Sequence, residues 1–206
     1  MQKDNVNIAV LVSGGGTNLQ ALIDAQKNGV IKSGEIKLVI SNNAIAYALK
    51  RANENNIPSA VITKKECGGI TAMEEKMISI LEDNHIDLIV LAGFMSILSE
   101  NFTKKYDHRI INVHPSLIPS FCGEGFYGLK VHEAALKKGV KVTGATVHFV
   151  NEIPDDGEII LQKAVNVLEN DTPKSLQARV MKQAEWIILP RAVEIVSKKI
   201  LKERNK

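Results

Sequence analysis

Short apolar runs alternate with amphipathic stretches up to residue 113, and this alternation limits the fold more than any other feature of the chain. The apolar runs, which are rich in β-branched residues, lie at Val6–Val12, Lys37–Ile40, Ala60–Ile62, Leu88–Leu91 and Ile110–Val113. The helical stretches between them lie near Asn18–Asn28, Ala46–Asn55 and Thr71–Asn84. Strands that alternate with helices predict an α/β fold with a doubly wound, mostly parallel sheet.

The pattern changes after residue 114, where two longer strands follow one another. The elements predicted here are a helix at Gly128–Lys138, strands at Lys141–Val150 and Glu158–Val167, and a last helix at about Lys174–Lys202. The two strands can pair as an antiparallel C-terminal extension of the sheet, with Asn151–Gly157 as the loop between them. Pro190 is expected to bend or break the last helix, because proline cannot donate the helical hydrogen bond.

Length and composition fit one globular domain. The chain has 206 residues, of which 45% are hydrophobic and 24% charged, and it shows no internal repeat or Pro-rich linker. We therefore predict a single domain over residues 1–206. The net charge of +3 comes from lysines that are spread along the chain, so nucleic-acid binding is not predicted.

Neither a membrane segment nor a metal site is predicted. The apolar stretch Ile86–Met95 is too short to span a bilayer and is interrupted by Asp87. The first residues, Met1–Asn7, lack the apolar region of a signal peptide, so the expected location is the cytoplasm. The spacing of Cys67 and Cys122 suits neither a metal site nor a disulfide framework, and no catalytic role is expected for either.

An amide and an imidazole stand at one predicted strand end. Asn112 and His114 are two residues apart, so on a strand both side chains project from one face. Pro115 ends the strand, and open α/β sheets bind ligands at the carboxyl ends of their strands. A carboxylate, Asp155, follows in the loop predicted between the two later strands.

These three side chains suit the transfer of a formyl or acyl group to an amine. Attack by the amine creates an oxyanion and releases a proton; Asn112 and His114 can stabilise the oxyanion, and His114 can relay the proton. A carboxylate at Asp155 would favour the protonated imidazole and fix its orientation. Each residue alone is open to a structural interpretation as a turn former or packing residue, and only the combination favours catalysis.

A glycine-rich segment, Ser13–Asn18 (SGGGTN), lies between the first predicted strand and helix. Glycines at this place let backbone N–H groups surround a phosphate, and the helix dipole adds to the attraction. The segment lacks the spacings of nucleoside-triphosphate and dinucleotide loops, and no acid follows the second strand to bind a ribose. A sugar monophosphate is therefore favoured over ATP or NAD, and a tight turn that binds nothing is the alternative.

Several motifs resemble the folate-dependent formyltransferase family. Asn112–Pro119 (NVHPSLIP) is similar to the family signature Asn-x-His-Pro-Ser-Leu-Leu-Pro, and Ser13–Gln20, Leu91–Met95 and Thr146–Val150 match further family segments in the same order. The resemblance implies a Rossmann-like formyltransferase fold. It also implies transfer of the formyl group of 10-formyltetrahydrofolate to the amine of phosphoribosylglycinamide in purine biosynthesis. Small-molecule partners and a monomer or weak homodimer are expected.

The resemblance also implies a role for individual residues. Catalysis would rest on Asn112, His114 and Asp155, and the substrate phosphate would lie on Gly16, Thr17 and Asn18. The amine end of the substrate would meet Lys182 and Glu185. The folate would be bound, mostly through backbone groups, by Met95, Ser96, Ile97, Leu98, Asn112, Asn151, Glu152, Ile153, Pro154 and Asp155.

Three departures from the family pattern concern the edges of this site. Ser96 stands where many members have arginine, and Ile70 replaces another basic residue, so binding of the folate tail is expected to differ. Lys64 or Lys65 are candidates to compensate. The loop Phe121–Gly128 is longer than in many relatives and is expected to change how the entrance closes.

Other functions use a similar site. Formyltetrahydrofolate deformylase would be expected to carry an extra domain before the first strand, and methionyl-tRNA formyltransferase a basic RNA-binding domain after the catalytic one. A sensor that binds sugar phosphate or folate without turnover is the alternative from a different class, because a fold alone does not establish a function.

Overall fold

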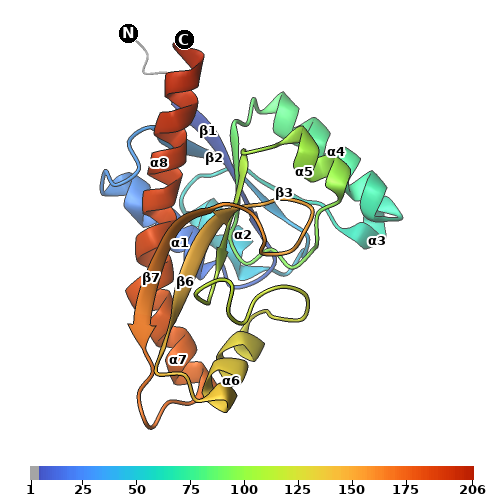
Figure 1. Cartoon of the computed structure of the whole chain (residues 1–206). Helices are drawn as coiled ribbons and strands as arrows, with labels where there is room; N and C mark the ends of the chain where they lie inside the picture. The colour runs from blue at the N-terminus through green and yellow to red at the C-terminus, as the bar shows by residue number, and fades with distance from the viewer. Residues whose placement is uncertain (1–4) are drawn as a thin grey trace.

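Seven strands form one sheet in the order β3-β2-β1-β4-β5-β6-β7 in the computed structural model, which describes residues 5–206 (Figure 1). The first residues, 1–4, on which part of the signal-peptide prediction rests, lie outside the described range. The parallel strands are β1 (Val6–Val12), β2 (Gly34–Ser41), β3 (Ser59–Val61), β4 (Leu88–Leu91) and β5 (Ile110–His114). The antiparallel strands are β6 (Val142–Phe149) and β7 (Ile159–Asn166). The predicted mostly parallel sheet with an antiparallel extension is confirmed.

Helices cover both faces of this sheet, and Figure 1 shows α8 on one side and α4 and α5 on the other. The helices are α1 (Thr17–Lys27), α2 (Tyr47–Glu54), α3 (Lys64–Cys67), α4 (Ile70–Asp83), α5 (Glu100–Lys105), α6 (Leu129–Lys138), α7 (Pro173–Val180) and α8 (Trp186–Arg204). The sequence did not predict α3 and α5. Both are short, and each is begun by a side-chain cap, from Thr63 and Ser99 respectively.

The alternation along β1 explains why helices pack on both faces. Ile8, Val10 and Val12 belong to one buried cluster together with residues of α1 and α8. Ala9 and Leu11 belong to the other cluster, which includes residues of α4 and α5. A strand that is apolar on both sides can be stabilised only when both faces are covered, as in a doubly wound sheet.

The last helical region is irregular before Pro190 rather than at it. A π-helical turn, η1 (Met181–Glu185), joins α7 to α8, and Pro190 is buried inside α8. The predicted break at Pro190 is therefore wrong. In a regular helix, the N–H at position 190 would donate to the carbonyl oxygen of Trp186. Trp186 is the first residue of α8, directly after the π turn, so the missing hydrogen bond falls where the helical bonding pattern already changes. Among residues 5–206, no helix combines the length and apolarity needed to cross a bilayer.

The strand order brings together the segments that are predicted to bind substrates, at the carboxyl ends of neighbouring strands. The chain runs from β1 outward to β2 and β3, then returns to β4 on the other side of β1. The segments after β1, β4 and β5 therefore leave the sheet at neighbouring carboxyl ends, around the point where the strand order reverses. This is the place where open α/β sheets bind ligands.

Gly144 allows β6 and β7 to approach closely, and this generates a stability prediction. A Cβ atom at this position would overlap the carbonyl oxygen of Lys163 and lie 2.8 Å from Leu117 Cδ2. Gly144→Ala should therefore lower the free energy of unfolding by about 1–3 kcal/mol in urea titrations. The control is Gly69→Ala, where nothing lies within 4 Å of the added atom and φ is an extended 163°. Equal stability losses in the two variants would contradict the prediction.

Candidate active site

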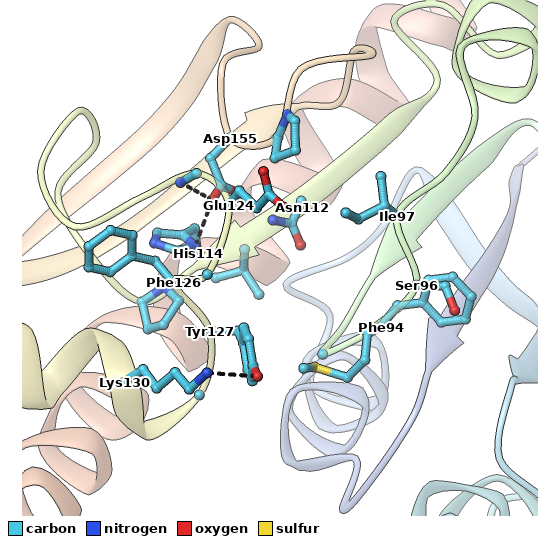
Figure 2. A pocket seen from close by; sticks show the side chains of 18 residues that line it. Phe94, Ser96, Ile97, Asn112, His114, Glu124, Phe126, Tyr127, Lys130 and Asp155 are labelled. Carbon is cyan, nitrogen blue, oxygen red and sulfur yellow. Dashed lines mark hydrogen bonds and ion pairs between the residues drawn. The ribbon is translucent and has the colours of Figure 1, made fainter.

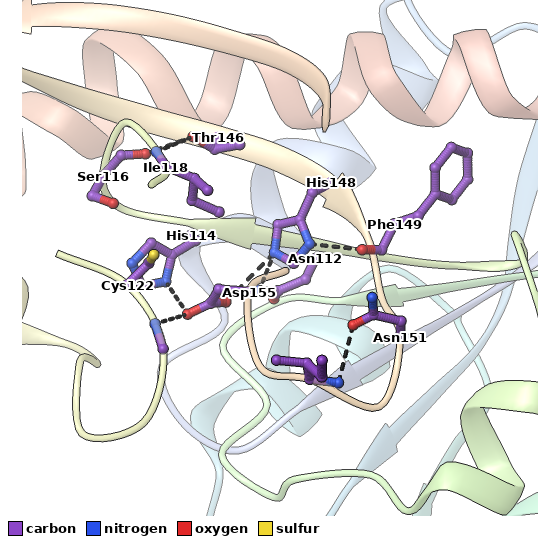
Figure 3. Close-up of polar contacts among 12 residues, drawn as sticks. Asn112, His114, Ser116, Ile118, Cys122, Thr146, His148, Phe149, Asn151 and Asp155 are labelled. Carbon is purple, nitrogen blue, oxygen red and sulfur yellow. Dashed lines mark hydrogen bonds and ion pairs between the residues drawn. The ribbon is translucent and has the colours of Figure 1, made fainter. Parts of the chain in front are cut away.

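Asn112 and His114 project from the same face at the end of β5, as the sequence predicted. Ile111 and Val113, which alternate with them, belong to the buried cluster on the opposite face. His114 is 5% exposed, so its ring is almost removed from solvent. Figure 3 shows Asn112 and His114 on either side of the Asp155 side chain.

The structure brings Asp155 to this strand end from the loop between β6 and β7. Its Oδ2 atom lies 3.3 Å from His114 Nδ1 and accepts a hydrogen bond of 2.9 Å from the Gly123 N–H. Asp155 has a left-handed φ of 60°, a conformation that Asp tolerates better than most residues. The predicted combination of amide, imidazole and carboxylate is thus one cluster in space.

His148 is a fourth member of the cluster that the sequence interpretation missed. Its Nδ1 lies 2.7 Å from the Phe149 carbonyl oxygen, which can only accept, so Nδ1 carries the proton. In the neutral ring, Nε2 therefore accepts from Asn112 Nδ2 at 3.2 Å. This fixes the orientation of the Asn112 amide and leaves its second N–H for an oxyanion. The available signal was the segment Thr146–Val150, which matches the family and contains His148.

The contacts of His114 define where a proton can arrive. Its Nε2 lies 2.9 Å from the Phe121 carbonyl oxygen and must donate to it. In the neutral ring, Nδ1 then carries a lone pair that faces the Asp155 carboxylate. A proton that reaches Nδ1 would give each ring nitrogen an acceptor, so the geometry stabilises the imidazolium once it forms.

Burial nevertheless favours the neutral form of His114, whereas the sequence analysis considered only the effect of the Asp155 carboxylate. Burial lowers the pKa of His114 below its ordinary value, although the Asp155 carboxylate and the Phe121 carbonyl act in the opposite direction. The expectation that Asp155 keeps His114 charged at rest is therefore corrected. Burial also acts to raise the pKa of Asp155, but His148, His114 and the Gly123 N–H together hold that pKa below its usual range. The resting pair is a neutral imidazole beside a carboxylate.

A cavity of about 640 Å³ opens beside this cluster (Figure 2). Asn112, His114 and Asp155 line it, with Phe94 and Ile97 on the other wall. The loop predicted to influence the entrance, Phe121–Gly128, supplies much of the rest of the lining: Gly123, Glu124, Gly125, Phe126, Tyr127 and Gly128. Cys122 in that loop is partly buried, and burial raises the pKa of its thiol.

A second cavity of about 130 Å³ adjoins the first, since Asn112, Asp155 and Ile97 line both. Most residues of the two predicted folate segments line one or both cavities: Met95, Ser96, Ile97, Leu98, Asn151, Glu152, Pro154 and Asp155. Ile153 lines neither and is 54% exposed.

Ser96, which replaces the arginine of many family members, has a defined hydrogen-bond partner. Ser96 accepts a hydrogen bond of 2.8 Å from Asn42 Nδ2, so it is tied to the end of β2. Lys64 and Lys65 line neither cavity, and Lys130 is the basic residue in the lining. Compensation by Lys64 or Lys65 stays a prediction.

Within the glycine-rich segment, Gly16 is left-handed and precedes α1 as its N-cap. Gly16 and Thr17 lie beside Asn18, whose Nδ2 donates a 2.7 Å hydrogen bond to Glu185 Oε2. Glu185 is 6% exposed, whereas Lys182 is exposed. The structure therefore places Glu185 against the glycine-rich segment, and its assignment to the amine end of the substrate stays a prediction.

In the described part of the chain, no group of three or more His, Cys, Asp and Glu side chains is arranged to hold a metal ion. The side chains of the cluster around Asp155 can donate and accept hydrogen bonds. A carbonyl carbon held beside Asn112 would find an oxyanion donor, a proton acceptor and a partly buried carboxylate within one site.

Comparison with known proteins agrees with this geometry. The family model described as formyl transferase matches residues 6–193. The chain belongs to the formyl transferase family. It is 42% identical to phosphoribosylglycinamide formyltransferase of Haemophilus influenzae over 187 residues, which cover 91% of this chain and 85% of that protein.

Two further relatives extend the comparison of this formyl transferase. The trifunctional purine biosynthetic protein adenosine-3 of Gallus gallus is 45% identical over 96% of this chain, but the chain spans only 19% of that protein's length. The crystal structure of glycinamide ribonucleotide transformylase 1 from Symbiobacterium toebii has 38% identity and a TM-score of 0.89, covering 96% of this chain and 90% of that chain. The fold is therefore shared with solved members of the family.

The buried Glu185 makes the stability of this formyl transferase depend on pH. Burial raises the pKa of Glu185 to about 7, against the effect of the Asn18 hydrogen bond. Between pH 4.5 and about 7 the folded protein keeps a proton that the unfolded chain has released, so stability falls as the pH rises through this window. Glu185→Gln should therefore be more stable than wild type at pH 8, by up to roughly 3 kcal/mol, and similar at pH 4.5. Urea unfolding at both pH values measures this, and a less stable variant at pH 8 would contradict it.

The opposing effects of burial and of Asp155 on the pKa of His114 can be measured directly. Its pKa, followed by NMR of the imidazole Cε1–H, should lie below the ordinary value of about 6.5. In Asp155→Asn the pKa should fall further, because the carboxylate that favours the charged ring is lost. An increase in this variant would show that Asp155 does not stabilise the imidazolium.

Proposed function

We propose that this chain transfers the formyl group of 10-formyltetrahydrofolate to the amine of phosphoribosylglycinamide, a step of purine biosynthesis. The observation that carries the proposal is the contact of Asp155 with His114, beside Asn112 and a cavity, in a member of the formyl transferase family. The name of the Haemophilus influenzae relative, which is similar along most of both chains, supports the same substrate.

The two cavities suit two substrates that meet at the cluster. The smaller cavity has apolar walls from Leu91, Leu98 and Val150, together with polar groups of Asn151 and Glu152. A flat heterocycle with donors and acceptors, such as a pterin, fits a site of this kind. The larger cavity would then hold the formyl group and the amine, since it includes the His114 ring.

The reaction begins when the amine nitrogen attacks the formyl carbon. A new carbon–nitrogen bond forms, and the carbonyl oxygen takes the negative charge, which the free N–H of Asn112 stabilises. The amine must lose a proton, and His114 Nδ1 is the ring nitrogen able to accept it. Asp155 stabilises the resulting imidazolium at 3.3 Å.

The second half of the reaction returns the same proton. The bond between the formyl carbon and the folate nitrogen breaks, and His114 donates its proton to that leaving nitrogen. One proton therefore moves from the amine to the folate, and the protein ends in its starting state. His148 contributes by holding the Asn112 amide in the donating orientation throughout.

The substrate phosphate would lie on the backbone N–H groups of Gly16, Thr17 and Asn18, at the start of α1. The Met95 N–H donates a 2.8 Å hydrogen bond to Ser13 Oγ, so the first folate segment is tied directly to the glycine-rich segment. This contact supports a fixed spacing between the two substrates. Glu185, which accepts a hydrogen bond from Asn18, would bind a donor group of the ribonucleotide.

The test is to follow folate absorbance with 10-formyltetrahydrofolate, with and without the ribonucleotide. Turnover should require the ribonucleotide and fall about 10²–10⁴-fold in His114→Ala. Asp155→Asn should lower kcat more than it raises KM, because its contact strengthens in the transition state. His85→Asn, an exposed histidine before the amino end of β4, is the matched control and should keep full activity.

Other outcomes identify the alternatives. Loss of the formyl group without the ribonucleotide would point to a deformylase that uses water as the nucleophile. Binding of both ligands without turnover would favour a sensor. Normal turnover of Asp155→Asn would remove Asp155 from the mechanism.

A further inference from the structure

The carbonyl groups of the glycine-rich segment are all turned toward α2 or into the first turn of α1. The segment between β2 and the end of α2 supplies one donor for each of three consecutive carbonyls. The donors are Asn43 Nδ2 to Ser13 O at 3.1 Å, Ala48 N to Gly14 O at 3.1 Å and Arg51 Nε to Gly15 O at 2.9 Å. The next carbonyl, of Gly16, accepts the first helical bond from the Gln20 N–H at 2.9 Å.

These bonds decide where the N–H groups of the segment point. In a trans peptide the C=O and the following N–H point in opposite directions. Holding the carbonyls of residues 13–15 toward α2 therefore turns the N–H groups of residues 14–16 toward the other side. Successive N–H groups on one side form a concave anion site of the kind that binds phosphate.

Close packing keeps this arrangement in place. Gly16 has a φ of 69°, and a Cβ atom there would lie 2.7 Å from Ala48 Cβ and 2.8 Å from Ala48 Cα. The glycine is thus required both by its conformation and by its contact with α2. The Gly15–Arg51 bond lies beside this contact, since the same Cβ would be 3.4 Å from Arg51 Cδ.

Arg51 is itself fixed by three contacts. Besides Gly15 O, its Nη1 donates to Gln20 Oε1 at 3.1 Å, and its guanidinium carbon lies 5.0 Å from the centre of the Tyr47 ring. A planar guanidinium that is stacked and hydrogen-bonded holds one orientation better than a flexible ammonium does. Its charge also offsets the partial negative charge of the Gly15 carbonyl.

We infer that Arg51 is a positioning residue for the phosphate of the ribonucleotide, acting through the peptide between Gly15 and Gly16. This inference rests on the proposed function, which places that phosphate on residues 16–18. Arg51 bonds to the loop carbonyl, and the loop N–H groups bind the phosphate. Without Arg51 the peptide is free to rotate its carbonyl toward the phosphate, where two partial negative charges would repel.

The test compares Arg51→Gln with Lys50→Gln, which removes the neighbouring positive charge on α2. Lys50 forms an ion pair with Glu54 at 3.8 Å and lies 5.4 Å from the centre of the Tyr47 ring, so it is a matched control. Arg51→Gln should raise KM for the ribonucleotide about tenfold, with kcat and KM for the folate within about twofold of wild type. Lys50→Gln should change none of these, and Arg51→Lys should restore part of the loss.

A second readout separates binding from folding. Ribose 5-phosphate should raise the melting temperature of wild type and of Lys50→Gln, and this shift should be lost in Arg51→Gln. An unchanged KM, an equal rise of both KM values, or a full ligand shift in Arg51→Gln would overturn the role of Arg51. If wild type neither uses the ribonucleotide nor responds to ribose 5-phosphate, the proposed function fails, and the inference fails with it.

Discussion

The carboxylate of Asp155 joins three parts of the molecule that are far apart in the chain. It accepts a hydrogen bond from the Gly123 N–H and lies 3.3 Å from His114 and 3.5 Å from His148. Because the two rings already give a proton each to backbone carbonyls, the carboxylate faces a lone pair on both of them in the neutral state. Protonation of His114 at Nδ1 replaces its lone pair with an N–H that faces the carboxylate. The site is therefore arranged to receive one proton, which is what transfer of a formyl group to an amine requires.

The antiparallel extension of the sheet makes this cluster possible. Asn112 is paired with His148 across β5 and β6, and the loop that follows β6 returns Asp155 to the end of β5. A slip of one residue in this register would turn His148 to the other face of the sheet. The close approach at Gly144 is on the opposite edge of β6, where that strand pairs with β7.

The sequence predicted features that local patterns control and missed those that depend on distant contacts. The bounds of β1 and β4 follow from continuous apolar runs, and the shared face of Asn112 and His114 follows from strand geometry. His148 was missed because its partner is defined only by cross-strand register. The protonation of His114 was misjudged because burial outweighs the nearby carboxylate, and burial is not visible in the local sequence. The break predicted at Pro190 was wrong, and the π turn that precedes α8 was missed because it has no clear sequence signal.

The ionisable groups of the site indicate that charge arrives with the substrates. His114 has a lowered pKa, and Glu185 has a pKa raised to about 7, so burial favours the neutral form of both. Among Asn112, His114 and Asp155, the charged side chain is then Asp155, and Glu124 and Lys130 also line the larger cavity. A phosphate held on neutral N–H groups at the start of α1 would add its own charge at the Asn18 end, away from that carboxylate. In the proposed mechanism, positive charge would appear on His114 only while it holds the transferred proton, which is when the nearby carboxylate would contribute most to lowering the barrier.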